Sequence, residues 1–243
     1  GAFKNEKDNH VHHTDCGFTT GIGVFDSLLC TERKIQFPQD HFDRLIHDCE
    51  IVIGKTPSSF TFDKFKSTIH ALLEKNNINT KHARIRTTIT GGTVCAPLAT
   101  VTDLNIFMIA GETKLSAPKT ATIIEGIPRV AGCVLENCKR LDYTRAFIAR
   151  RKAKEISADE AIITNTNGNI ACGATSNIFI KENGKLFTPP LSEGVLAGVT
   201  RKNLIKDQKI DEEAISINRL KQADKIYLSN SFFGLSKITL ISH

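Results

Sequence analysis

The alternation of apolar and polar positions in the first half of the chain predicts a sheet covered by two helices. Residues 21–35 are apolar and rich in β-formers, which predicts two strands joined by a turn near residues 31–34. Apolar residues then recur at helical spacing through 42–53 and again through 62–73. Two β-branched runs, 83–90 and 103–110, are separated by glycines and a proline, which favours an antiparallel pair. Together these elements predict a first α/β lobe.

The second half predicts another mixture of strands and helices. The polar stretch 111–120 contains Pro118 and lacks apolar periodicity, so we place a domain boundary near residue 115 and expect domains at 1–114 and 115–243. Further elements are expected as strands at 121–125 and 161–164, a hairpin across Asn183-Gly184, and helices at 141–155 and from residue 199. The sequence therefore predicts an α/β (α+β) protein of two domains.

Composition narrows the class of protein. Apolar residues make up 40% of the 243 residues and charged residues 24%, the balance of an ordinary globular chain. The net charge of +6 comes from interleaved charges, which argues against a nucleic-acid arm, and no stretch approaches the ~20 apolar residues of a membrane span. We therefore expect a small-molecule substrate and neither a nucleic-acid nor a membrane partner.

Cysteine and histidine usage points to a reducing compartment without a metal site. The seven cysteines are odd in number and form no C-x-x-C pair, so we expect a cytoplasmic protein with reduced thiols. His10, His12 and His13 lie in the polar start of the chain, where a solvated terminus explains them better than metal binding.

Three features could carry chemistry, but none is specific alone. Arg44 could grip a phosphate, although most arginines on amphipathic helices are solvated or salt-bridged. Gly198 leads into a helix whose first amides could attract phosphate, as many helix starts could. Lys139 precedes a helix in apolar surroundings that could lower the pKa of its amine, although an isolated lysine is usually a surface residue.

The order and spacing of these features resemble the fold-type IV enzymes that depend on pyridoxal 5'-phosphate (PLP). That family includes branched-chain aminotransferases, D-amino-acid aminotransferases and 4-amino-4-deoxychorismate lyases. The resemblance runs from Asp15 to Ile241. It is carried by Asp15-Cys16-Gly17, Gly21-Ile22-Gly23-Val24-Phe25-Asp26, His41-x-x-Arg44-Leu45, Lys139-Arg140-Leu141-Asp142-Tyr143, Ala158-Asp159-Glu160-Ala161, Ser176-Asn177-Ile178-Phe179, Thr188-Pro189, Gly198-Val199-Thr200-Arg201 and Asn230-Ser231.

The resemblance implies a two-domain fold like that of D-amino-acid aminotransferase, with PLP in the interdomain cleft, and usually a homodimer. It implies that Lys139 forms the Schiff base and moves a proton at the substrate Cα. Tyr143 would hydrogen-bond the phenolic oxygen of PLP, with one helix bringing Lys139 and Tyr143 onto the same face as i and i+4 residues. The phosphate would be held by Arg44, the amides of Val199 and Thr200, and the polar pair Asn230 and Ser231.

Two residues depart from the family pattern. Cys172 stands where the family usually has a glutamate that keeps the pyridine nitrogen protonated, so the cofactor ring should be a weaker electron sink unless another acid reaches that nitrogen. Asp26 stands where relatives often have glutamate.

The resemblance leaves three functions open. The string from His41 to Cys49 resembles the lyase branch somewhat more than the others, which favours a 4-amino-4-deoxychorismate lyase forming 4-aminobenzoate and pyruvate for the folate pathway. The second reading is an aminotransferase acting on D- or branched-chain amino acids. The third is a PLP-binding paralogue that has lost catalysis through Cys172.

Overall fold

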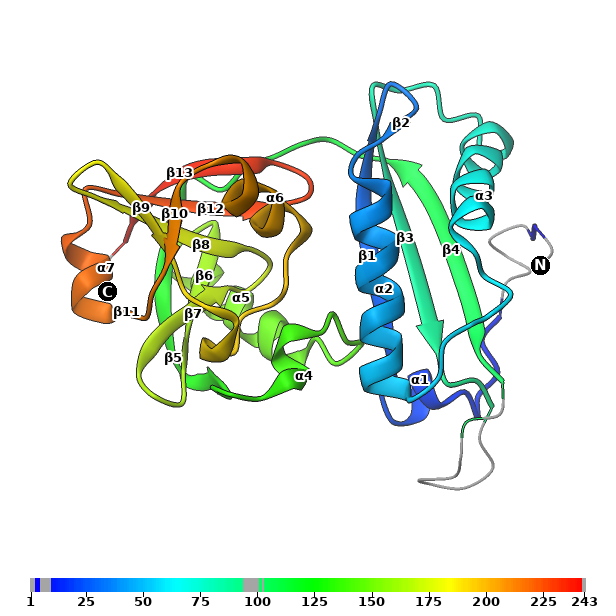
Figure 1. The fold of residues 1–243 in the computed structure, drawn as a ribbon, viewed down its shortest axis with the longest axis horizontal. Coiled ribbons are helices and arrows are strands. Elements are labelled where there is room, and N and C mark those ends of the chain that lie inside the picture. The colour runs from blue at the N-terminus through cyan, green and yellow to red at the C-terminus, as the bar shows by residue number, and fades with distance from the viewer. Residues whose placement is uncertain (1–2, 5–9, 94–100, 102, 242–243) are drawn as a thin grey trace.

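The chain forms two lobes, each built on its own sheet and joined by a single linking segment across the top of the view in Figure 1. The computed structural model describes residues 3–4, 10–93, 101 and 103–241. We call the elements up to β4 the N-terminal lobe and those from β5 the C-terminal lobe. None of the helices in these described ranges has the length and apolar content that a membrane crossing needs.

The N-terminal lobe is a four-stranded antiparallel sheet in the order β2-β1-β3-β4, with α2 and α3 packed on one face. The structure contains the strand pair that the sequence predicts at 83–90 and 103–110, and both of the helices predicted before it. The elements are α1 (Cys16–Thr19), β1 (Gly23–Thr31), β2 (Lys34–Ile35), α2 (Pro38–Ile53), α3 (Phe62–Lys75), β3 (His82–Thr90) and β4 (Asn105–Glu112).

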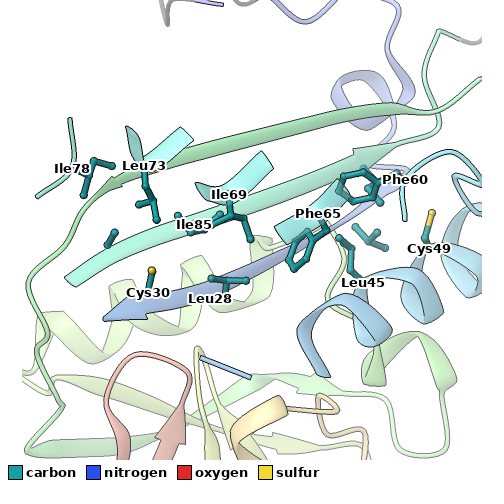
Figure 2. Close-up of a cluster of buried hydrophobic side chains, with 13 residues drawn as sticks. Leu28, Cys30, Leu45, Cys49, Phe60, Phe65, Ile69, Leu73, Ile78 and Ile85 are labelled. Carbon is teal, nitrogen blue, oxygen red and sulfur yellow. The ribbon is translucent and has the colours of Figure 1, made fainter. Parts of the chain in front are cut away.

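The apolar stripes of the two helices explain this packing. Leu45 and Cys49 of α2, together with Phe65 and Ile69 of α3, are buried against β1 and β3, as Figure 2 shows. Residues at the ends of both helices also favour these helix boundaries. Thr61 caps α3 by accepting a hydrogen bond from the Lys64 amide, whereas α2 begins at a proline and ends at Gly54 in the left-handed conformation.

The C-terminal lobe contains a nine-stranded mixed sheet in the order β10-β9-β8-β12-β13-β5-β6-β7-β11, counted over the described residues. The parallel pairs β5–β6 and β5–β13 lie at its centre. The Asn183-Gly184 hairpin is present, and both residues have the positive φ that a tight hairpin turn requires. The elements are β5 (Thr120–Arg129), α4 (Val134–Asn137), α5 (Thr144–Glu155), β6 (Glu160–Asn165), β7 (Asn169–Gly173), β8 (Asn177–Glu182), β9 (Lys185–Thr188), a 3-10 turn (Leu191–Glu193), α6 (Val199–Asp207), β10 (Ile210–Glu212), β11 (Ile215–Ser216), α7 (Ile217–Gln222), β12 (Lys225–Asn230) and β13 (Gly234–Leu240).

Three polar contacts tie α2 to α6 and to the segment just before it, across the lobes. Asp40 accepts hydrogen bonds from Lys202 at 2.5 Å and from Asn203 at 2.9 Å. One turn further along α2, Arg44 donates to the carbonyl oxygen of Ala197, just before α6, at 3.3 Å. The start of α6 is thereby held close to the middle of α2.

Candidate active site

The segment around Lys139 pairs with β1 as a short additional strand. The Phe25 amide donates to the Lys139 carbonyl oxygen at 2.9 Å, and the Leu141 amide donates to the Gly23 carbonyl oxygen at 3.0 Å. The Lys139 amide donates to the Asp48 carboxylate on α2 at 2.8 Å. Lys139 therefore belongs to the C-terminal half of the chain, but its backbone is fixed by the N-terminal lobe.

The amine of Lys139 lies over two aromatic rings in a half-buried position. Its Nζ is 4.5 Å from the centroid of the Phe25 ring and 5.4 Å from that of Tyr143. Burial, and next the nearby charge of Arg44, lower the pKa of Lys139 to about 7. A large fraction of this amine is thus unprotonated at neutral pH, which is the state that attacks a carbonyl carbon.

One sequence expectation about this segment is wrong. The helix expected from residue 141 begins at Thr144, and Tyr143 is its N-cap residue, so Lys139 and Tyr143 are not i and i+4 partners on a helix. Lys139 is extended because it pairs with β1. Phe25 brings the two side chains together instead, since its ring packs edge-on against Tyr143 at a centroid distance of 5.4 Å.

A cavity of about 420 Å³ opens beside the Lys139 amine. Cys172 lies outside it but lines a smaller adjoining cavity of about 50 Å³, whose wall also includes Lys139 and Tyr143. The other candidate residues from the sequence all line the larger cavity, namely Arg44, Lys139, Tyr143, Val199, Thr200, Asn230 and Ser231.

Three buried hydroxyl groups indicate that this cavity normally holds a polar ligand. The Oγ atoms of Ser27, Ser176 and Ser229 lack a hydrogen-bond partner among the described residues, and all three serines line the larger cavity. Buried polar groups in native proteins are nearly always paired, so unpaired hydroxyls around one cavity are expected where a ligand completes them.

The start of α6 offers an anion site on the same wall. Gly198 is the N-cap residue and provides no side-chain cap, so the amides of the first turn, Val199 and Thr200, are not capped by a side chain. A side chain at position 198 would collide with Asn177, because a Cβ there would lie 2.0 Å from Asn177 Oδ1. Glycine therefore allows the close packing that places this helix start at the cavity.

Arg44 reaches the cavity from a buried ion-pair network. Its Nη2 and Nε donate to Asp26 Oδ2 at 2.6 and 3.0 Å, and His41 Nδ1 lies 2.6 Å from Asp26 Oδ1. Burial alone would raise the pKa of Asp26, but Arg44 and His41 outweigh it and hold that pKa well below its usual range. A guanidinium has five N–H donors, of which three serve Asp26 and Ala197, so two remain for a phosphate.

Asn230 and Ser231, at the end of β12, have different roles. The Asn230 amide oxygen accepts from the Phe232 and Phe233 amides at 2.9 and 3.2 Å, and its amide nitrogen donates to Thr175. Asn230 therefore shapes the turn, and Ser231 on that turn lines the cavity.

The Cys172 end of the site contains acids that are already bonded. Burial raises the pKa of the Cys172 thiol, which keeps it neutral. Glu136, nearby, forms an ion pair with Arg129. Nη1 of Arg145 also donates to both carboxylate oxygens of Glu136, at 2.8 and 3.0 Å. Glu160 accepts from Thr175 at 2.5 Å and from the Ala161 amide at 3.0 Å.

Sequence reasoning missed several residues of the cavity wall. Phe25 and Ser27 of β1 and Arg84 and Arg86 of β3 all line it, and each pair has the two-residue spacing that places side chains on one face of a strand. Arg84 and Arg86 alternate in the sequence with Ala83, Ile85 and Thr87, which are buried. This alternation is a signal that could have predicted that the two arginines face away from the core.

Comparisons with known proteins agree with this geometry. Residues 23–241 match the family described as Amino-transferase class IV. The chain is 28% identical over 244 residues to a protein of Methanocaldococcus jannaschii provisionally named branched-chain-amino-acid aminotransferase, with 95% of this chain and 82% of that protein covered. It is 26% identical to the D-alanine aminotransferase of Staphylococcus epidermidis, with 99% and 87% covered. A crystal structure from Legionella pneumophila, provisionally named 4-amino-4-deoxychorismate lyase, superposes with a TM-score of 0.90 at 24% identity, covering 98% of this chain and 89% of the other.

The chain therefore belongs to the class IV aminotransferase family, as its sequence motifs indicated, and has its two-sheet α/β fold. Enzymes of this class use PLP, and matched structures include a PLP-bound and a pyridoxamine-phosphate-bound protein. The site described above fits that cofactor, because it combines an amine of lowered pKa, a free helix start beside Arg44, and unpaired buried hydroxyls.

Proposed function

We propose that Lys139 is the residue that binds PLP covalently and moves the proton at the substrate Cα. The observation that carries this proposal is the position of its amine, which is half-buried over Phe25 with a pKa of about 7 and opens into the cavity. An amine that titrates near neutrality can serve both as a nucleophile and as an acid or base.

The other residues have matching roles in this proposal. Bound PLP supplies an aldehyde for amines and a ring that accepts electron density from Cα. Arg44 holds the phosphate with its two remaining N–H groups, together with the Val199 and Thr200 amides and with Ser231 on the turn shaped by Asn230. The Tyr143 hydroxyl donates to the phenolic oxygen, and burial raises its pKa, which keeps it protonated as a donor.

In this proposal Cys172 would face the pyridine nitrogen, because it stands where the family usually has its glutamate. A neutral thiol does not hold a proton on that nitrogen as a carboxylate does. Glu136 and Glu160 are the acids whose charges act on Cys172, but the first is bound by two arginines and the second by Thr175. We therefore infer that neither acid replaces the family's glutamate and that the chain runs its chemistry with a weakened electron sink.

The reaction we propose is the lyase reaction that converts 4-amino-4-deoxychorismate into 4-aminobenzoate and pyruvate, a step of folate biosynthesis. The string His41–Cys49 supports it, and the cationic wall formed by Arg84 and Arg86 suits a substrate with two carboxylates. Aromatisation of the product ring also drives this reaction. The lyase reaction therefore depends less than transamination on how strongly the cofactor ring withdraws electrons.

The second candidate is an aminotransferase for branched-chain or D-amino acids. It is favoured by the names and identities of the relatives, 28% to the M. jannaschii protein and 26% to the D-alanine aminotransferase. The third candidate, a PLP-binding protein without catalysis, is favoured only by Cys172.

One experiment separates these functions. The PLP-loaded protein is incubated with 4-amino-4-deoxychorismate, and separately with D- and L-amino acids plus 2-oxoglutarate, and 4-aminobenzoate and glutamate are quantified by chromatography. Release of 4-aminobenzoate supports the lyase, and glutamate formation alone ends that proposal in favour of the aminotransferase. A protein that binds PLP on Lys139 but turns over neither substrate supports the third candidate.

We further propose that the protein is a homodimer. Val134 of α4 and Phe147 of α5 are 53% and 67% exposed, close to Leu135 and Tyr143 at the wall of the smaller cavity. Light scattering after gel filtration should give about twice the chain mass of 26.8 kDa. The Phe147→Asp variant should shift toward the monomer if this patch forms the interface.

A further inference from the structure

Asp48 is a buried carboxylate that joins α2 to the lysine segment. Its side chain is 2% exposed, and its Oδ2 accepts from the Lys139 amide at 2.8 Å. Pairing with β1 takes up the Lys139 carbonyl oxygen and the Leu141 amide, but not the Lys139 amide. Asp48 therefore supplies the acceptor that the pairing with β1 does not.

Asp48 stands one helical turn from Arg44 on α2. Four residues of an α-helix rise about 6 Å. The Arg44 guanidinium is held by Asp26 at 2.6 and 3.0 Å. Leu45 and Cys49, the residues that follow Arg44 and Asp48, are buried in the core and hold the helix against the sheet. The helix thus sets the distance between the guanidinium proposed to hold the phosphate and the backbone from which the reacting amine extends.

The acceptor is a carboxylate, although a neutral group would serve a backbone amide equally well. Burial raises the pKa of Asp48, so its charge is unfavourable there. Arg44 and His47 on the same helix lower this pKa, and Asp26 raises it. Burial, and next Asp48, raise the pKa of the Cys138 thiol to about 12, so this neighbour adds no charge. Within the described ranges no ion pair includes Asp48, so its charge calls for another explanation.

The charge of Asp48 acts on the Lys139 amine. Burial lowers the pKa of this amine most, and Arg44 on α2 and Arg86 on β3 lower it further. Asp26 on β1 and Asp48 raise it, and the balance lies at about 7. Without Asp48 the amine would lose its proton at lower pH. It would then be less able to hold the proton that it has to return to the substrate.

We propose that Asp48 is a positioning residue for the reacting amine. It fixes the start of the Lys139 side chain one helical turn from the phosphate grip of Arg44, and its negative charge helps the amine to hold the proton moved at Cα. This inference rests on the proposed role of Lys139, because that role makes the amine the reacting group.

The first measurement uses the cofactor-free protein. Lys139 is labelled with acetic anhydride at a series of pH values, and peptide mass spectrometry gives the rate. Asp48→Asn keeps an acceptor oxygen but removes the charge. The midpoint of Lys139 labelling should therefore move to lower pH, and the rate at pH 6.5 should rise about twofold. Asp43→Asn removes an exposed carboxylate from the same helix and, as the matched control, should leave the midpoint unchanged.

The second measurement compares PLP with pyridoxal, which lacks the phosphate. Schiff-base formation with each aldehyde is followed by absorbance. Asp48→Ala frees the Lys139 amide, so holding the phosphate no longer brings the aldehyde to the amine. The preference for PLP should fall roughly tenfold, while the reaction with pyridoxal stays the same. Asp48→Asn keeps the acceptor and should retain the preference to within about twofold of the native protein.

The outcomes separate this inference from the proposed function. A midpoint that Asp48→Asn does not lower, or a preference for PLP that Asp48→Ala leaves intact, overturns the inference. An equal loss for both aldehydes in Asp48→Ala also overturns it, because a merely structural role predicts that result. The labelling of Asp48→Asn decides the matter if Asp48→Ala does not fold. Failure of the proposed function differs: borohydride would leave no pyridoxyl group on Lys139 of the native protein, whereas the midpoint would still move in Asp48→Asn.

Discussion

The Lys139 amide and the Asp48 carboxylate form a 2.8 Å hydrogen bond that joins the lysine segment to α2. Burial raises the pKa of Asp48, and the hydrogen bond from Lys139 opposes that rise. Together with the two backbone hydrogen bonds to β1, this contact fixes where the lysine side chain starts. The position of the amine is therefore a property of the N-terminal lobe as much as of its own segment.

Asp48→Ala should lower the free energy of unfolding by about 1–3 kcal/mol, because it leaves the Lys139 amide without its acceptor. Asp48→Asn keeps an acceptor oxygen and should lose less. Asp63→Ala, on an exposed residue of α3, is the control. Chemical denaturation measures all three, and an Asp48→Ala protein as stable as the control would contradict the prediction.

Lys139→Ala should abolish covalent PLP capture. The native protein treated with PLP and then borohydride should carry a pyridoxyl group on the peptide that contains Lys139. Lys185→Ala, at an exposed position of β9, should behave as the native protein. A pyridoxyl group found only on other lysines would refute the assignment.

Modification of Lys139 should follow an amine pKa of about 7. With a neutral reagent such as acetic anhydride, its labelling rate should rise from pH 6 to 8 and then level, because a group of this pKa is about nine-tenths deprotonated at pH 8. Arg86→Gln should move the midpoint to higher pH, since the charge of Arg86 lowers this pKa. Peptide mass spectrometry follows the rate, with Lys185 as the internal reference; a midpoint near 10 would contradict the prediction.

Cys172→Glu should speed proton removal from the substrate Cα by about tenfold or more, or about 1.4 kcal/mol in the barrier, because a carboxylate keeps the pyridine nitrogen protonated. Exchange of the Cα hydrogen in deuterated solvent, followed by NMR, measures this step directly. Cys172→Ala adds no carboxylate and should give no gain. Equal or faster exchange by the native protein would show that Cys172 does not limit the electron sink.

Asp26→Asn should weaken PLP binding about tenfold, since Asp26 orients Arg44 toward the cavity. A positioning role predicts that the preference for PLP over pyridoxal, which lacks the phosphate, falls while pyridoxal binding is unchanged. Asp43→Asn, on an exposed residue of α2, is the matched control. An equal loss for both ligands would indicate a general structural defect instead.

Local pattern predicted much of the fold, and its errors have a physical cause. Residues close together in the chain determine the apolar stripes that contain Leu45 and Phe65, so α2 and α3 could be expected from the sequence. The same is true of the Asn183-Gly184 turn and the β8–β9 hairpin. Lys139 was placed in the wrong backbone conformation because its extended shape comes from pairing with β1, more than 100 residues away in sequence. The division into two independent domains near residue 115 stays a prediction.

The candidate site could be predicted only where motif spacing carries it. Arg44, Lys139 and Gly198 stand in recognisable strings, whereas Ser27 and Asp48 reach the site through long-range packing that no local string records. Arg84 belongs with them, because its place beside Leu29 and Gly111 is set by strand register. Such residues emerge only when the sheet is assembled.

The pairing of the lysine segment with β1 also bears on how the chain unfolds. Backbone bonds between Gly23–Phe25 and Lys139–Leu141 cross from one lobe to the other, so separating the lobes would strip Lys139 of its hydrogen-bond partners. Loss of either half should therefore dismantle the reactive amine, and the two halves should melt in a single cooperative transition. If the chain were cut in the linking segment, neither fragment alone would display the chemistry, and mixing the two would be needed to restore it.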